Sequence, residues 1–97
     1  ENNLKAVVSY LQQSGIQVVS ATEKGTDFHF QADLSGPLAI VMGSEEDGVS
    51  PELIRSCDRL LRIPMIGAIS SLNVSVACGI MLYEAIRQRM KSDDIQL

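Results

Sequence analysis

The sequence has too little positive charge for a protein that grips nucleic acid along its whole surface. Eight Lys and Arg stand against twelve Asp and Glu in 97 residues, which gives a net charge of −4 at pH 7. Any contact with phosphates must therefore be local. Each local cluster of cations, taken alone, is more typical of a solvated helix face. Two such clusters are present: Arg55, Arg59 and Arg62, and Arg87, Arg89 and Lys91.

Cysteine is scarce, and a long uninterrupted apolar run is absent. Cys57 and Cys78 have no nearby cysteine or histidine cluster, which indicates reduced thiols in packed positions. Residues 63–83 carry no formal charge, but Pro, Gly, Ser and Asn interrupt them, so the apolar part is too short to cross a bilayer. A basic segment followed by an apolar one, as in a signal peptide, is also missing from the start. These absences predict a cytoplasmic location and no membrane partner.

The sequence does contain enough apolar residues for the core of one domain. Apolar residues make up 45% of the chain and charged residues 21%, in a length that suits a single core. Helix and strand patterns alternate, which predicts an α/β fold with a parallel sheet flanked by helices. Strands are expected at Ile16–Ala21, Leu38–Met42 and Leu60–Ile63. Helices are expected from Leu4 to a stop at Gly15, from Pro51 to about Cys57, and from about Asn73 to Met90.

An acidic loop, GSEEDG, follows the second predicted strand at residues 43–48. Ligands of parallel α/β folds sit beyond the carboxyl ends of the strands, so this loop is a candidate for function. Its acids do not match a calcium loop, and no Lys-Ser or Lys-Thr pair follows its glycines to hold a phosphate. We therefore expect no metal site. Gly43 could let a ligand approach the backbone and Glu45 could offer a carboxylate, or the loop could be an acidic surface turn.

An apolar loop of about nine residues follows the third predicted strand, between Pro64 and Asn73. Its backbone N–H and C=O groups need partners, and an apolar surface with free backbone groups suits a flat ligand such as adenine. Ser71 or Asn73 can cap the following helix, and their role could end there. Capping is compatible with ligand binding, because the first turn of a helix also offers N–H groups to an anion.

The last predicted helix is apolar on nearly all sides over its first three turns. A sheet in so short a chain covers one side of a helix, so a second side must meet something else. The simplest partner is a second subunit across a two-fold axis, and the alternative is a part of the protein outside this chain. One apolar stripe comprises Val74, Ala77, Cys78, Met81 and Ala85, and the other comprises Val76, Ile80, Tyr83 and Ile86.

Two long motifs in order resemble a known family. LAIVMGSEEDGVS, followed by RIPMIGAISSLNVSVACGIMLYEAIRQR, is similar to the second and third motifs of the TrmH-type branch of the SPOUT superfamily, the RNA 2′-O-ribose methyltransferases. The resemblance runs from about Leu38 to Arg89. It implies an α/β knot and a homodimer that forms through the C-terminal helix.

The resemblance also implies a cofactor, a substrate and a set of site residues. The cofactor is S-adenosylmethionine, and the substrate is tRNA or rRNA. Gly43, Ile63 and Leu72 correspond to cofactor-contacting positions, largely through backbone groups. Glu45, Ser71 and Asn73 correspond to the polar residues of the reaction pocket. Glu46 departs from the pattern, because many relatives have Gly there.

The domain organisation follows from the same resemblance. Residues 1–97 correspond to the C-terminal part of the methyltransferase domain, and the first motif with its arginine is absent from this chain, as is any N-terminal RNA-binding domain. We therefore expect the isolated chain to be inactive. Two alternatives remain: a non-catalytic knotted module for dimerisation or RNA binding, and a generic nucleotide-binding α/β domain.

Overall fold

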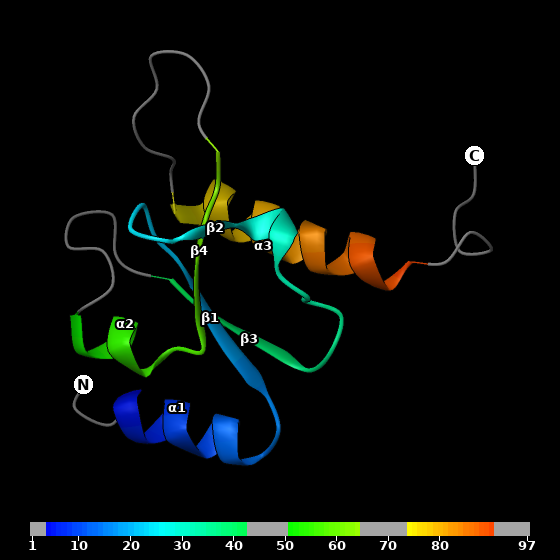
Figure 1. Ribbon diagram of the computed structural model, residues 1–97. Coiled ribbons are helices and arrows are strands. Elements are labelled where there is room, and N and C mark those ends of the chain that lie inside the picture. Colours follow the sequence, from blue (N-terminus) through cyan, green and yellow to red (C-terminus); the bar gives the residue numbers. More distant parts are fainter. Residues whose placement is uncertain (1–3, 43–50, 65–73, 91–97) are drawn as a thin grey trace.

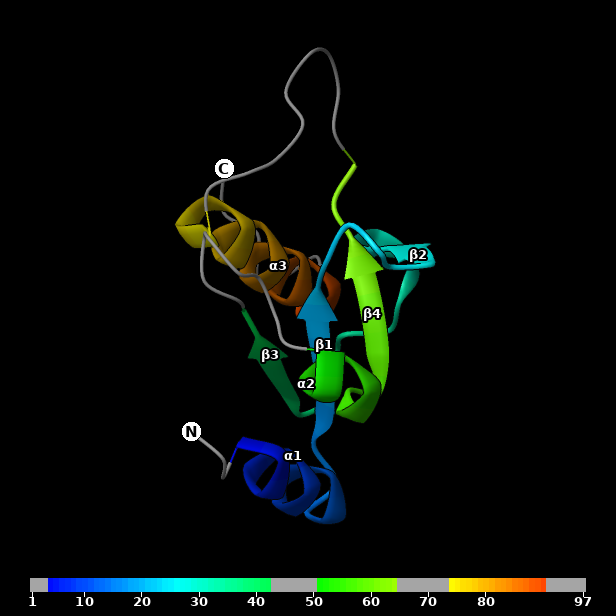
Figure 2. The same cartoon turned by 90° about the vertical axis from the view of Figure 1, so that its left-hand side faces the viewer.

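A parallel four-stranded sheet forms the centre of the computed structural model, which describes residues 4–42, 51–64 and 74–90. The strand order is β2-β4-β1-β3, and every neighbouring pair is parallel. Figure 2 shows the strands side by side, with β3 and β2 at the two edges. The strands are β1 (Gln17–Ala21), β2 (Asp27–Phe28), β3 (Leu38–Val41) and β4 (Arg59–Arg62).

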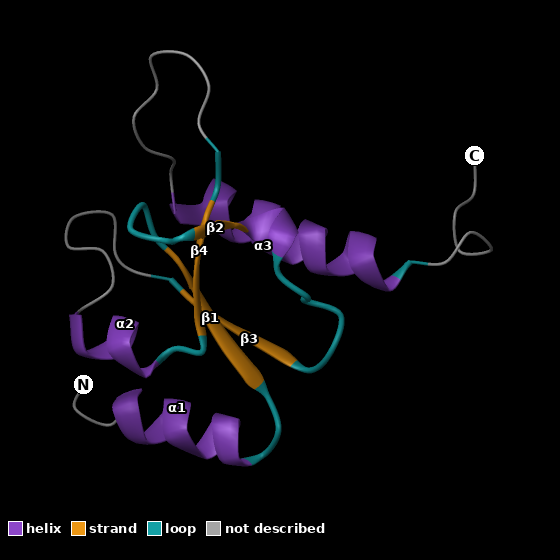
Figure 3. Ribbon diagram, viewed as in Figure 1, coloured by secondary structure: helices purple, strands orange, loops and turns teal. Residues whose placement is uncertain are grey.

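Helices lie on both sides of this sheet (Figures 1 and 3). They are α1 (Leu4–Gln13), α2 (Pro51–Ser56) and α3 (Val74–Arg89), together with the short 3-10 helix η1 (His29–Gln31). The first two helices contact each other, and α1 also contacts β1. In both views α3 lies away from this pair, along the other side of the strands. The predicted parallel sheet flanked by helices is thus confirmed.

The alternation of side chains along β1 explains how both faces become covered. Val18 and Val19 are both fully buried, and successive side chains of a strand point to opposite faces. Val19 belongs to the main core cluster with Met81 and Ala85 of α3. Burial of two adjacent residues is typical of a parallel sheet with helices on both faces.

The end of α1 follows the sequence prediction. Gly15 has a φ of +84°, a left-handed conformation that glycine adopts without the strain of a Cβ atom. The N–H groups of Gly15 and Ile16 donate to the carbonyls of Gln12 and Leu11, both at 3.0 Å, which satisfies two acceptors at the helix end. The chain then turns directly into β1.

Every predicted element is present with ends shifted by at most a few residues, but two short elements were missed. Residues 27–28 form β2, and residues 29–31 form η1. Strand β2 pairs only with β4, through Asp27 opposite Leu61 and Phe28 opposite Arg62. Two residues are too few to show a hydrophobic periodicity, which is why the sequence pattern did not predict this strand. Its formation depends on pairing with the edge of β4.

Asp58 fixes the position of β4 beside β1. Its carboxylate accepts a hydrogen bond from the backbone N–H of Val18 at 2.7 Å, and its own N–H donates to the Val18 carbonyl at 2.7 Å. Nearby, the Gln12 side chain of α1 donates to the carbonyl of Ser56 at 2.7 Å, which ties α1 to the end of α2. These contacts set the register in which β4 reaches the carboxyl edge of the sheet.

Candidate functional site

The carboxyl edge of the sheet brings together the two strand ends that precede the candidate loops. Strands β3 and β4 are parallel neighbours of β1, one on each side, so they end at the same edge (Figure 2). The chain leaves this edge after Met42 toward residues 43–50, and after Pro64 toward residues 65–73. The two motifs that are separate in the sequence therefore start from strand ends separated by a single strand, which is where ligands of parallel folds bind.

Of the six predicted site residues, the structure describes one. Ile63 follows β4 directly, is partly buried and packs against the main core cluster. No hydrogen bond to its backbone N–H or C=O is formed by any described residue. A residue held in place at this edge, whose backbone groups have no partner among the described residues, fits the implied contact with a cofactor through the main chain. The other five lie outside the described residues: Gly43, Glu45, Ser71, Leu72 and Asn73.

Helix α3 begins at Val74, immediately after the second candidate loop, and its inward side matches the first predicted stripe. Met81 is fully buried and Ala85 is 4% exposed, both in the core cluster. The second stripe faces outward: Val76, Tyr83 and Ile86 are 51%, 68% and 49% exposed. This large apolar surface agrees with the prediction that the helix meets something beyond its own sheet.

An open groove of about 520 Å³ runs along this outer side of α3, next to η1. His29 is buried, and its Nδ1 atom has no hydrogen-bond partner among the described residues. His29 packs under α3. The groove is lined by His29, Val76, Gly79, Ile80, Tyr83 and Glu84.

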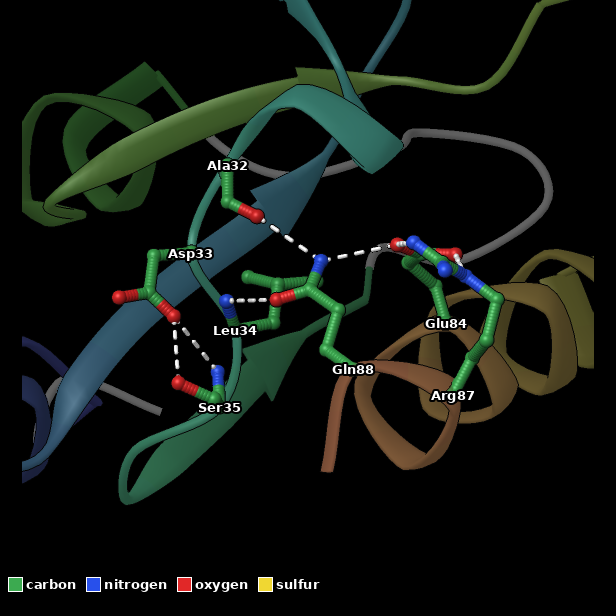
Figure 4. A network of polar contacts seen from close by, with 7 residues as sticks. All are labelled: Ala32, Asp33, Leu34, Ser35, Glu84, Arg87 and Gln88. Atoms are coloured by element: carbon green, nitrogen blue, oxygen red, sulfur yellow. Dashed lines mark hydrogen bonds and ion pairs between the residues drawn. The ribbon is translucent and has the colours of Figure 1, made fainter. Parts of the chain in front are cut away.

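A cluster of polar contacts, which we call the Gln88 clamp, holds the second half of α3 to the segment between η1 and β3 (Figure 4). The Gln88 amide donates to the Ala32 carbonyl at 2.9 Å, and its oxygen accepts from the Leu34 N–H at 2.7 Å. The same amide also donates to the Glu84 carboxylate at 2.8 Å. Arg87 donates twice to Glu84, at 3.0 and 2.8 Å. The clamp fixes the second half of α3 against this segment.

The hydrogen bonds from Arg87 hold the pKa of Glu84 at about 2, well below its usual 4.5. Gln88 and the charges of Arg87 and His29 act in the same direction, while burial opposes them. A carboxylate with a lowered pKa stabilises the fold above its unfolded pKa, and this contribution is lost as the pH falls toward the folded value. The contribution of Glu84 is thus complete above about pH 4.5 and disappears near pH 2.

We therefore expect acid to weaken the fold through Glu84. Because the Arg87 side chain is 63% exposed, solvent screens the pair, and we expect a loss of about 1–2 kcal/mol in unfolding free energy between about pH 4.5 and 2. Urea unfolding across this range measures it. Glu84→Gln should flatten that part of the profile, whereas Glu23→Gln, at an exposed position, should keep the wild-type slope. Equal slopes for wild type and Glu84→Gln would refute the assignment.

The cysteines behave as the sequence predicted. Both thiols are free and partly buried, and burial together with the Asp58 charge raises the pKa of Cys57. A raised pKa keeps the thiol protonated and unreactive. Within the described parts of the chain, His, Cys, Asp and Glu form no group of three or more that could hold a metal. None of the described helices combines the length and hydrophobicity needed to span a membrane.

Known proteins share both the sequence and the fold. Residues 1–83 match the SpoU rRNA Methylase family. A 23S rRNA (guanosine-2'-O-)-methyltransferase RlmB from Vibrio vulnificus (strain CMCP6) is 51% identical over 90 residues, which are 93% of this chain and 36% of the relative.

Two solved structures extend the similarity to three dimensions. A TrmH/SpoU tRNA modifying enzyme from A. aeolicus has a TM-score of 0.77 and 40% identity, over 87% of this chain and 43% of that enzyme. An AdoMet-bound rRNA methyltransferase from Sinorhizobium meliloti has a TM-score of 0.79 and 34% identity, over 91% of this chain and 34% of that enzyme.

The chain spans about a third of the length of the curated relatives it matches. The match includes the second family motif in full and the third as far as Tyr83, because it covers the acidic loop, the apolar loop and the first part of α3. The prediction of the TrmH-type family is thereby confirmed at the level of the family. On sequence and on fold, the chain belongs to the SpoU rRNA Methylase family.

Proposed function

We propose that residues 1–97 are the C-terminal, cofactor-binding and dimerisation part of an RNA 2′-O-ribose methyltransferase that uses S-adenosylmethionine. One structural observation carries this proposal: β3 and β4 end on either side of β1, at the edge from which both candidate loops start. The names of the relatives support the reaction, since a 51% identical protein is an rRNA 2′-O-methyltransferase. The AdoMet-bound neighbour supports the cofactor.

The proposed cofactor residues are Gly43, Ile63 and Leu72, and the proposed pocket residues are Glu45, Ser71 and Asn73. S-adenosylmethionine would supply the methyl group that the ribose 2′-hydroxyl accepts. Ile63 would contribute free backbone groups from a position that the core holds in place. The pocket residues would orient the ribose through hydrogen bonds, which the apolar loop shields from water.

The hydroxyl is a poor nucleophile, so a cation or base must lie beside it. We infer that the arginine of the first motif fills this role from a part of the protein outside these 97 residues. The share of the relatives' length that this chain covers, about a third, supports that division. An N-terminal RNA-binding domain would belong to the same outside part. The whole protein would act in the cytoplasm on tRNA or rRNA.

The outward side of α3 is the proposed dimer face. Its exposed residues and the groove beside η1 form one apolar surface, which a second copy of the helix would cover across a two-fold axis. The trefoil knot is part of the same proposal: the C-terminal part of the chain would be threaded through a loop. A dimer would also place two cofactor sites close to the shared face.

The first test is cofactor binding by this chain. Calorimetric titration with S-adenosylmethionine should give a saturable signal, and the midpoint of thermal unfolding should rise with cofactor concentration. S-adenosylhomocysteine should compete, whereas adenosine alone should bind much more weakly. A protein that includes the first motif and shows neither heat nor stabilisation would instead support the non-catalytic dimerisation or RNA-binding module.

The second test separates catalysis from nucleotide binding. In a protein that includes the first motif, Asn73→Ala should lower the rate of methyl transfer to RNA by about 100-fold, because a hydrogen bond that orients the reacting groups is lost. Gln13→Ala, on the exposed side of α1, is the matched control and should leave the rate unchanged. A generic nucleotide-binding domain predicts wild-type rates for both variants.

A further inference from the structure

Two phenylalanine rings form a stack at the free edge of the sheet. Phe28, the last residue of β2, and Phe30, in η1, have ring centroids 5.5 Å apart and planes inclined by 17°. The His29 ring meets Phe30 edge-on, with centroids 5.4 Å apart, which holds that ring from the side. A near-parallel pair braced in this way is a rigid flat surface.

The stack has an exposed end and a cation beside it. Phe30 is 49% exposed, although an aromatic ring of this size is normally buried. At the other ring, the Arg62 guanidinium lies 5.0 Å from the centroid of Phe28. Among the described residues, no carboxylate or other acceptor pairs with Arg62, whose guanidinium carries five N–H donors that suit an anion. We call Phe28, Phe30 and Arg62 the aromatic platform.

The aromatic platform lies next to the candidate site. Phe28 pairs with Arg62, the last residue of β4, and Ile63 follows at once. Figure 2 shows β2 beside the upper half of β4, at the sheet margin away from β3. Asp27 at this margin forms an ion pair with Arg59, with a nitrogen–oxygen distance of 3.5 Å. Its carboxylate is therefore paired with Arg59 and does not neutralise the positive charge of Arg62.

We propose that the aromatic platform binds an unpaired RNA base, which stacks on the half-exposed Phe30 while Arg62 contacts a neighbouring phosphate. This inference rests on the proposed RNA substrate and adds a surface outside the two family motifs. Single-stranded RNA is bound in this way by many proteins, because aromatic rings and guanidinium groups stack on unstacked bases. The platform joins a stacking surface to a cation that can contact a phosphate, and single-stranded RNA offers a partner to both.

The sequence, which contains no Trp, gives a direct test. Phe30→Trp would carry the single tryptophan of the chain at the platform, and stacking of a base on indole quenches its fluorescence. Titration with single-stranded oligoadenylate at low salt should quench this signal to saturation. In a polarisation assay, Phe30→Leu should weaken binding of labelled oligoadenylate by about 5- to 100-fold, the range for loss of one stacked base. Arg62→Gln should weaken it and reduce its dependence on salt.

Tyr10→Leu is the matched control, because it also replaces an exposed aromatic ring with Leu. Tyr10 is 69% exposed and lies on α1, outside the platform. The control variant should bind oligoadenylate like wild type. Circular dichroism should show every variant folded, and the half-exposed position of Phe30 makes Phe30→Trp the variant least expected to disturb folding.

Three results would overturn the proposal. Phe30→Leu could bind oligoadenylate as tightly as wild type, wild type could fail to bind it at all, or Phe30→Leu could change the mass in analytical ultracentrifugation and leave RNA binding intact. The last result would assign the platform to a contact between protein chains. Cofactor titration of the same samples separates this failure from failure of the proposed methyltransferase function, since the platform variants should bind S-adenosylmethionine like wild type.

Discussion

Gly25→Ala is expected to lower the free energy of unfolding by about 3 kcal/mol, at the upper end of the cost of inserting a methyl group into packed structure. A Cβ atom at Gly25 would lie 2.7 Å from the Leu61 carbonyl carbon, 2.9 Å from the Arg62 nitrogen and 2.9 Å from the Leu60 oxygen. All three are backbone atoms of β4, which cannot rotate aside as a side chain can. The turn after β1 must therefore move away from β4, or β4 must shift.

This substitution should also report on the candidate site, because β4 leads directly into Ile63. If the end of β4 shifts, the affinity for S-adenosylmethionine should fall together with stability. Urea unfolding and calorimetric titration measure the two effects. Gly36→Ala is the control: nothing lies within 4 Å of its Cβ position, and we expect a change within about 0.5 kcal/mol. A stable Gly25→Ala variant with wild-type unfolding would contradict the close approach of this turn.

Gln88→Ala is expected to destabilise the chain by about 2–3 kcal/mol, because one side chain serves three partners. Its removal leaves the Leu34 N–H without its acceptor and the Ala32 carbonyl without its donor, next to side chains that are 0% and 4% exposed. A buried polar group without a partner costs about 1–3 kcal/mol. Glu84 also loses one of its donors.

Amide hydrogen exchange can localise this effect. In Gln88→Ala, exchange at the Leu34 N–H should accelerate more than exchange in β1, which the clamp does not touch. Gln13→Ala removes an exposed side chain whose single contact is a 3.4 Å hydrogen bond to Ser9, and it should change stability by less than about 0.5 kcal/mol. Similar unfolding curves for the two glutamine variants would show that the Gln88 clamp contributes little.

The elements that could be predicted are those whose local pattern is complete in itself. LAIV in β3 is a continuous apolar run, Gly15 is a glycine at a helix end, and α3 is long and rich in helix formers. Each of these patterns lies within the element that it specifies. In the folded chain, tertiary packing agrees with these local preferences, so the predictions are confirmed.

What could not be predicted depends on contacts between distant residues. The position of β4 between β1 and β2 leaves no trace in the pattern of any single strand. The two backbone partners of Gln88, the Leu34 N–H and the Ala32 carbonyl, are 54 and 56 residues away in the sequence. A glutamine near a helix end is usually a surface residue. In the sequence, Phe28 and Phe30 are simply one aromatic residue on each side of His29, a pattern that does not predict stacked rings. For the site itself, the family resemblance named six residues. Only Ile63 lies among the described residues, and its position at the end of β4 supports its assignment.

The place of β4 in the sheet also constrains when the protein can acquire its structure during synthesis. A nascent chain that ends before Arg59 can pair β1 with β3, but β2 has no neighbour, and the core lacks Leu61, Met81 and Ala85. Strand β4 is therefore added to the sheet after both of its neighbours, β1 and β2, have left the ribosome. We infer that this unit folds late and in one cooperative step, since its central strand and the helix that covers it are made last.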